Sequence, residues 1–72
     1  MAGLAKGDTV RVLKLTLRSS VEGRTPHVGE TATIRYVLQG VGILYVAERV
    51  ASNGTREWLC EFVPGDLQRV EH

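Results

Sequence analysis

Short runs of alternating apolar and polar residues, separated by turn residues, dominate this sequence. The clearest run is residues 31–38, whose predicted inward set is Ala32, Ile34, Tyr36 and Leu38. Because successive side chains of a β-strand point to opposite faces, this period of two predicts a half-buried strand. Residues 9–18 also alternate, but the phase switches between Val12 and Leu13, which predicts a β-bulge or a sharp bend near Val12.

Two further runs surround the strongest turn signal in the chain. Residues 43–50 are apolar and rich in β-branched side chains, which favours a central strand. The dipeptide Asn53-Gly54 then predicts a hairpin turn of type I′, since both central residues of that turn have positive φ. In the next strand, residues 56–63, the phase predicts that the side chains pointing inward are Trp58, Cys60 and Phe62.

The remaining segments complete an all-β plan of five strands. Residues 19–30 are polar, contain two glycines and a proline, and show no regular period, so they predict a long first loop. A loop of this length is either functional or a property inherited with the fold. Residues 64–67 predict a 3₁₀ turn before a last strand at residues 68–70. Five short strands with these connections favour a small antiparallel barrel over a sandwich.

Length and composition restrict the organisation of the chain. Its 72 residues allow one domain, residues 1–72, and its 43% apolar content is typical of a folded protein. No apolar run approaches the length of a transmembrane helix, so we expect no membrane insertion. The single Cys60 excludes an internal disulfide and predicts a reducing, cytoplasmic location.

Charge is nearly balanced overall but unevenly distributed. The net charge is +1, which provides no general attraction to phosphate backbones. Residues 1–36 carry six basic against three acidic side chains, and residues 37–72 carry three against five. Such a two-sided charge distribution favours a protein partner that binds in one orientation.

Three segments resemble the SH3-like barrels of the KOW type and of small redox-accessory subunits. Residues 6–12, Lys-Gly-Asp-Thr-Val-Arg-Val, are similar to the opening of these barrels, and residues 27–34 and 62–67 are similar to their second motif and to the turn before their last strand. The resemblance implies a five-stranded SH3-like barrel and a role as an adaptor. Relatives include RNA- or protein-binding modules of ribosomal and transcription factors, the variable subunit of ferredoxin-thioredoxin reductase and a small photosystem subunit. Ala32 stands where many relatives carry glycine, which weakens the nucleic-acid interpretation.

No pattern in the sequence predicts catalytic or cofactor chemistry. The groups that bind transition metals, His27, His72 and Cys60, are spread over a loop, a terminus and a strand. Residues 40–42 contain two glycines but precede no helix that could complete an anion site. We therefore expect no metal, no cofactor and no enzymatic activity.

Four side chains around the first loop are the predicted partner-binding residues, namely Arg18, Arg24, His27 and Arg35. One hypothesis is a non-catalytic binding module or accessory subunit that docks an acidic patch of a protein. The alternative is an RNA- or DNA-binding module of the KOW type, using the same basic half. A third hypothesis, an active site built by oligomerisation, also stays open.

Overall fold

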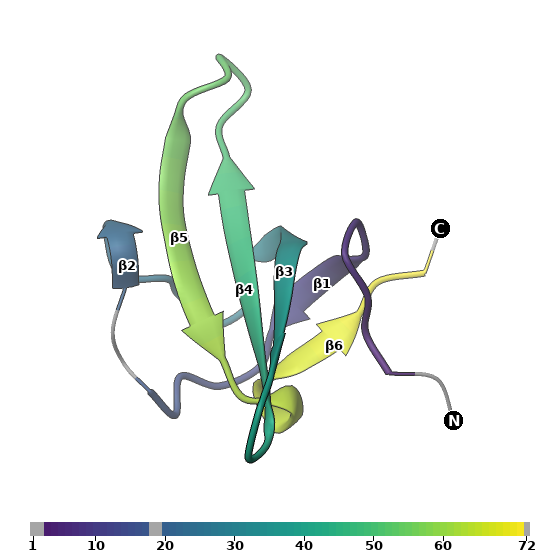
Figure 1. Cartoon of the computed structure of the whole chain (residues 1–72). Helices are drawn as coiled ribbons and strands as arrows, with labels where there is room; N and C mark the ends of the chain where they lie inside the picture. The colour runs from purple at the N-terminus through teal and green to yellow at the C-terminus, as the bar shows by residue number, and fades with distance from the viewer. Residues whose placement is uncertain (1–2, 18–19, 72) are drawn as a thin grey trace.

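The computed structural model of the chain describes residues 3–17 and 20–71 (Figure 1). This part of the chain forms an all-β structure with six strands and one 3₁₀ turn. The elements are β1 (Thr9–Val12), β2 (Ser20–Gly23), β3 (Thr31–Gln39), β4 (Ile43–Val50), β5 (Arg56–Phe62), η1 (Pro64–Asp66) and β6 (Leu67–Arg69).

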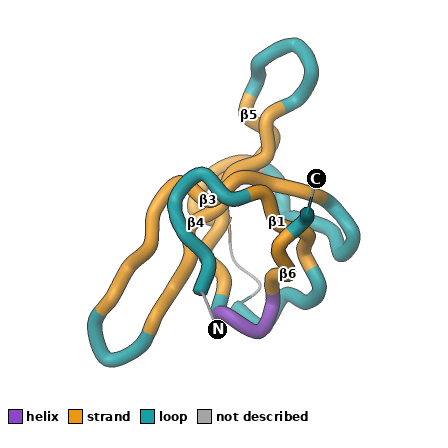
Figure 2. The backbone as a smooth tube through the Cα atoms, turned by 90° about the vertical axis from the view of Figure 1, so that its right-hand side faces the viewer, coloured by secondary structure: helices purple, strands orange, loops and turns teal. Residues whose placement is uncertain are grey.

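All six strands belong to one antiparallel sheet in the order β2-β5-β4-β3-β1-β6. The sheet is strongly bent, and Figure 2 shows the β3–β4 hairpin and the β4–β5 loop projecting in different directions. No pairing joins β2 to β6 in the described part of the chain, so these two strands are the edges of an open sheet. The structure thus confirms the expected all-β, antiparallel architecture. It does not show the expected closed barrel of five strands.

The core lies on the inner side of this bend. Trp58, Cys60 and Phe62 of β5 are buried, as the phase of the sequence predicted, and the rings of Trp58 and Phe62 meet edge to face at 5.8 Å. They pack with Val10 and Val12 of β1 and with side chains of the neighbouring strands. Burial of such side chains stabilises each by about 1.5–3 kcal/mol before entropy is subtracted.

The predicted inward face of β3 is correct only in its first half. Ala32 and Ile34 are buried, but Tyr36 and Leu38 are exposed by 53% and 44%. The register against β4 shifts between Ile34 and Tyr36, which is a β-bulge. Because one extra residue reverses the alternation, Val37 packs against the core where Tyr36 and Leu38 were expected.

The irregularity predicted near Val12 is present: Gly29 and Glu30 together lie opposite Val12, which is a β-bulge on the partner segment, and β1 ends at this residue. The Val12 N–H donates to the carbonyl of Glu30 (2.9 Å), and the Gly29 N–H donates to the carbonyl of Val12 (2.8 Å). The Leu13 N–H donates to the carbonyl of Asp66 (2.8 Å). The phase switch therefore marks the point where the chain leaves the sheet, and Leu13 is exposed.

Residues 19–30 are not one continuous loop, since β2 lies within them. The strand pairs antiparallel with β5, with one register shift between Ser20 and Glu22. Gly23 has a φ of +81°, and a Cβ at this position would stand 2.3 Å from the carbonyl oxygen of Glu57. The pairing depends on an edge provided by a strand far along the chain, which a local search for periodicity does not detect.

The turn predictions are confirmed in position. The β4–β5 hairpin is antiparallel, but the Gly54 N–H donates to the carbonyl of Ala51 (2.9 Å), so Ser52 and Asn53 are the central residues and the type I′ prediction is wrong. Gly54 follows them with a φ of +87°. The predicted 3₁₀ turn is η1, and the last strand begins at Leu67, one residue earlier than expected.

Candidate binding surface

Glu30 is the centre of an ion-pair network that joins the end of the first loop to β4 and β5. Its carboxylate accepts hydrogen bonds from Arg24 Nη2 (2.6 Å) and Nη1 (3.0 Å). It also accepts from the backbone N–H of His27 (2.8 Å) and from Trp58 Nε1 (3.3 Å). Arg24 also hydrogen-bonds to Glu57, so one guanidinium bridges two carboxylates.

Arg49 completes this network from β4. Its Nε lies 3.2 Å from Glu30 Oε2 and 3.6 Å from Glu57 Oε2. Its Nη1 donates to the carbonyl oxygen of Thr31 (2.8 Å) at the start of β3. Two arginines and two glutamates therefore balance their charges beside the indole of Trp58.

The pKa values of the network follow from these contacts. The hydrogen bonds from Arg24 lower the pKa of Glu30 from 4.5 to about 2, although partial burial opposes the change. Conversely, the hydrogen bonds to Glu30 and Glu57 raise the pKa of Arg24 above its ordinary value. Glu30 is therefore charged at neutral pH and is an ion-pair partner rather than a proton donor.

A second network occupies the outer face of the sheet. Glu48 of β4 lies 3.3 Å from Arg35 Nη1 and accepts a hydrogen bond from Arg56 Nε (2.7 Å). Arg56 also reaches Glu22 on β2 (3.2 Å). The hydrogen bond to Glu48 raises the pKa of Arg56 above its ordinary value. This network links β2, β3, β4 and β5 across their exposed face.

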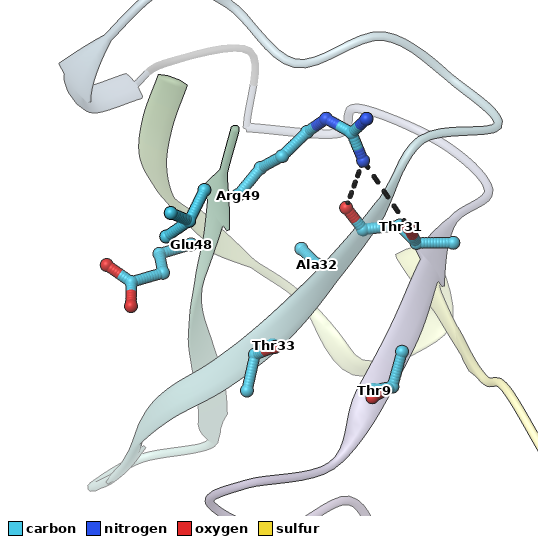
Figure 3. Close-up of a pocket in the computed structure, with 7 residues that line it drawn as sticks. Thr9, Thr31, Ala32, Thr33, Glu48 and Arg49 are labelled. Atoms are coloured by element: carbon cyan, nitrogen blue, oxygen red, sulfur yellow. Dashed lines mark hydrogen bonds between the residues drawn. The ribbon is translucent and has the colours of Figure 1, made fainter. Parts of the chain in front are cut away.

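A small polar hollow of about 190 Å³ lies between the two networks (Figure 3). Figure 3 shows Arg49 reaching across to Thr31, while the Glu48 carboxylate points away from the threonines. The hollow offers the hydroxyl groups of Thr9, Thr31 and Thr33. Its carboxylate, of Glu48, pairs with Arg35 and Arg56, and the Arg49 guanidinium donates to Thr31, although its Nε makes no hydrogen bond within the described residues. The charged side chains that line the hollow therefore stabilise contacts between neighbouring strands rather than supply groups for reactive chemistry.

A larger groove, of about 620 Å³, lies where the chain leaves β1. It is lined by Leu13, Lys14, Leu15, Thr16, Thr25 and Val28, and we call it the first-loop groove. Two of these residues, Leu13 and Val28, are 46% and 63% exposed to solvent. The groove therefore combines exposed apolar side chains with one cationic side chain.

The wall of the first-loop groove is held by a buried carboxylate. Asp66 of η1 accepts hydrogen bonds from the Thr16 N–H (2.7 Å) and the Thr16 hydroxyl (2.8 Å). The Asp66 carbonyl also accepts from the Leu13 N–H. On the opposite wall, the bonds between Val12 and residues 29 and 30 hold Val28 in place. A groove fixed from both sides loses little conformational entropy when it binds a ligand.

The predicted partner-binding residues do not form one exposed basic cluster. Arg24 and His27 meet at Glu30, with His27 Nδ1 at 3.9 Å from its carboxylate. Arg35 belongs to the second network, and Arg18 lies outside the described residues. Acidic partners compensate the charges of Arg24 and Arg35, and the assignment of the four residues to partner binding stays a prediction.

The first-loop groove was missed in the sequence, although a signal for it was present. Leu13, Leu15 and Leu17 continue the alternation of β1 in the opposite phase; in the structure Leu13 and Leu17 are exposed, and Leu15 packs partly against the core. Among the described residues of the basic half, Lys6, Arg11 and Lys14 form no ion pair. Lys14 is the one that lines the groove.

Within residues 3–17 and 20–71, no three histidine, cysteine or acidic side chains gather in a way that could hold a metal ion. His72 lies outside this range. The same residues contain no helix long and apolar enough to cross a membrane.

Comparison with known proteins gave no match by any of three routes. Neither a protein-family model, nor a curated protein, nor a solved structure matches this chain.

Proposed function

We propose that this chain is a non-catalytic binding module of the SH3-like type that docks a protein partner in the first-loop groove. The strand arrangement supports the SH3-like assignment: the last strand pairs with β1, β1 pairs with β3, and β3, β4 and β5 form a meander. A 3₁₀ turn before the last strand is a further similarity. A reducing, cytoplasmic location stays a prediction that rests on the single Cys60, whose side chain is buried.

The observation that carries this proposal is an apolar groove with a fixed wall and an uncompensated lysine. Leu13, Leu15 and Val28 favour an apolar side chain of the partner, because covering them removes apolar surface from water. Lys14 favours a carboxylate close to that side chain. The ligand that fits is therefore a short protein segment in which an apolar residue neighbours an acidic one.

The test is selection of peptides from a random displayed library with the purified protein. We expect the selected peptides to be enriched in an aspartate or glutamate next to an apolar residue. Val28→Asp and Lys14→Glu should each weaken their binding at least tenfold, which corresponds to about 1.4 kcal/mol. Both side chains are exposed, so we expect both variants to fold.

Two matched controls place equivalent charges elsewhere. Val21 on β2 is exposed by 57%, and Lys6 precedes β1. Val21→Asp and Lys6→Glu should bind the selected peptides as the unmodified chain does. The proposal fails if no acidic–apolar peptide is enriched, or if the controls weaken binding as much as the groove variants.

A further inference from the structure

The free edge of β3 differs from the other two edges of the sheet. β3 spans nine residues, but β1 covers only Thr31–Thr33, whereas β4 accompanies the strand to Gln39. The last backbone contacts on the β1 side are those of Ile34 with Gly7 and Asp8. Within the described part of the chain, residues 35–39 form no strand pairing and no backbone hydrogen bond on that side.

The two terminal edges carry features that discourage pairing with another chain. β2 has four residues, a register shift and the charged Glu22. β6 has three residues and includes Arg69, which pairs with Asp8. Short length, irregularity and charge are the usual means by which an edge strand avoids a further strand. Residues 36–39, Tyr-Val-Leu-Gln, have no charge and no proline.

The side chains along this edge are also unusual for an exposed surface. Tyr36 and Leu38 share the outer face of β3, where both are largely exposed. Val41 and Ile43 extend the exposed apolar surface around the end of the hairpin, beside a hollow that Leu38, Leu44 and Val63 help to line. Figure 2 shows that this hairpin projects from the rest of the molecule. A contiguous exposed apolar patch at an unpaired edge is typical of an interface.

We propose that the β3 edge pairs with the β3 edge of a second copy of this chain, in an antiparallel dimer with its two-fold axis at Val37. The sequence around Val37 is complementary to itself. In this register Tyr36 lies opposite Leu38 of the second copy, twice, so aromatic and aliphatic side chains pair on the outer face. The flanking Arg35 lies opposite Gln39, so no like charges meet. A closed two-fold contact of this kind uses the same patch on both copies.

The dimer would continue the sheet from one copy into the other. Its backbone hydrogen bonds would use groups of residues 35–39 that the described chain leaves without a strand neighbour. The first-loop groove is formed by other residues and does not take part. Failure of this proposal therefore leaves the proposed binding function untouched, and the reverse also holds.

Sedimentation equilibrium over a range of concentrations tests the proposal. We expect the unmodified chain to approach twice its mass of 7.9 kDa as concentration rises. Tyr36→Lys and Leu38→Glu should each shift the equilibrium to the single chain, since each sets a charge against an apolar side chain. Both positions are exposed, so neither change disturbs the core.

Two combinations test the register itself. The double variant Tyr36→Lys/Leu38→Glu sets opposite charges against each other twice and should restore the dimer. An equimolar mixture of the two single variants should form a mixed dimer through one such pair. Val21→Glu, on the β2 edge, is the control that should dimerise as the unmodified chain does.

A mass of 7.9 kDa at every concentration overturns the proposal. So does a dimer that Tyr36→Lys and Leu38→Glu leave intact. Dissociation by both single variants without restoration in the double variant overturns the proposed register.

Discussion

Glu30 links more parts of the chain than any other side chain described above. It receives hydrogen bonds from the first loop through Arg24 and His27 and from the core through Trp58. Arg49 adds a positive charge from β4. Such a network stabilises the folded chain because opposite charges face one another. Removing one member leaves the charges of the others uncompensated.

Replacing this carboxylate should lower stability in a way that depends on pH. Glu30→Gln keeps an acceptor for Trp58 but removes the charge that Arg24 and Arg49 face. We expect the free energy of unfolding at pH 7 to fall by about 2 kcal/mol. Urea titrations followed by the fluorescence of Trp58 measure the change.

The pH dependence has a definite sign. The pKa of Glu30 is lowered from 4.5 to about 2 in the folded chain, so its stabilisation is present above pH 4.5 and is lost as pH falls toward 2. The difference between the unmodified chain and Glu30→Gln should therefore shrink between about pH 5 and pH 2. Glu61→Gln, which removes a carboxylate without an ion pair among the described residues, is the control. A difference that stays constant over this range contradicts the assignment.

Among the strands, β2 depends most closely on a single backbone position. Gly23 lies against β5 so tightly that a Cβ would meet the Glu57 carbonyl oxygen at 2.3 Å, and its φ is positive. Real Cβ atoms do not approach backbone oxygen this closely, so the strand must shift to accommodate a side chain. Arg24, the next residue, would shift with it.

Gly23→Ala should therefore cost more than the backbone strain of an ordinary left-handed glycine. Gly29→Ala is the matched control, because Gly29 has a φ of +97° and a Cβ added there would meet no atom within 4 Å. We expect about 1 kcal/mol for Gly29→Ala and at least about 2 kcal/mol more for Gly23→Ala. Thermal unfolding of both variants checks this difference. Equal costs would show that β2 does not lie against β5 as described.

At the scale of the whole molecule, the reactivity of the Cys60 thiol shows whether the sheet unfolds locally or as one unit. Its side chain is 1% exposed at the centre of the core, and burial raises the pKa of its thiol. β5, which carries Cys60, is hydrogen-bonded to β2 along one edge and to β4 along the other. A thiol reagent can therefore reach the Cys60 sulfur only after the strands around it have separated.

We expect thiol labelling of the folded chain to be slow and to follow global unfolding. The labelling rate should rise with urea in parallel with the unfolded fraction measured by Trp58 fluorescence. A chain unfolded in urea should react at once. Rapid labelling in buffer, with Trp58 still buried, would instead indicate local opening of the β2 edge.

The sequence alone determined which segments become most of the strands and where the chain turns. The periods of residues 31–34 and 56–62, the hairpin at Asn53-Gly54 and the 3₁₀ turn at Pro64 all depend on interactions between near neighbours. Trp58, Cys60 and Phe62 were assigned to the core for the same reason, since phase along one strand is a local property.

Tertiary structure alone decided the features on which the proposals rest. The bulge after Ile34 turns Tyr36 and Leu38 outward, and it arises from the fit between β3 and β4 rather than from the period of β3. β2 forms because it can pair with the edge of β5. The positive charge of Arg24 is compensated because folding brings Glu57 to it from 33 residues away. Such pairings join residues that are far apart in the sequence and close together in the fold, so local sequence patterns do not predict them. The apolar edge at Val37 and the walls of the groove at Val28 therefore depend on contacts that only the folded sheet makes.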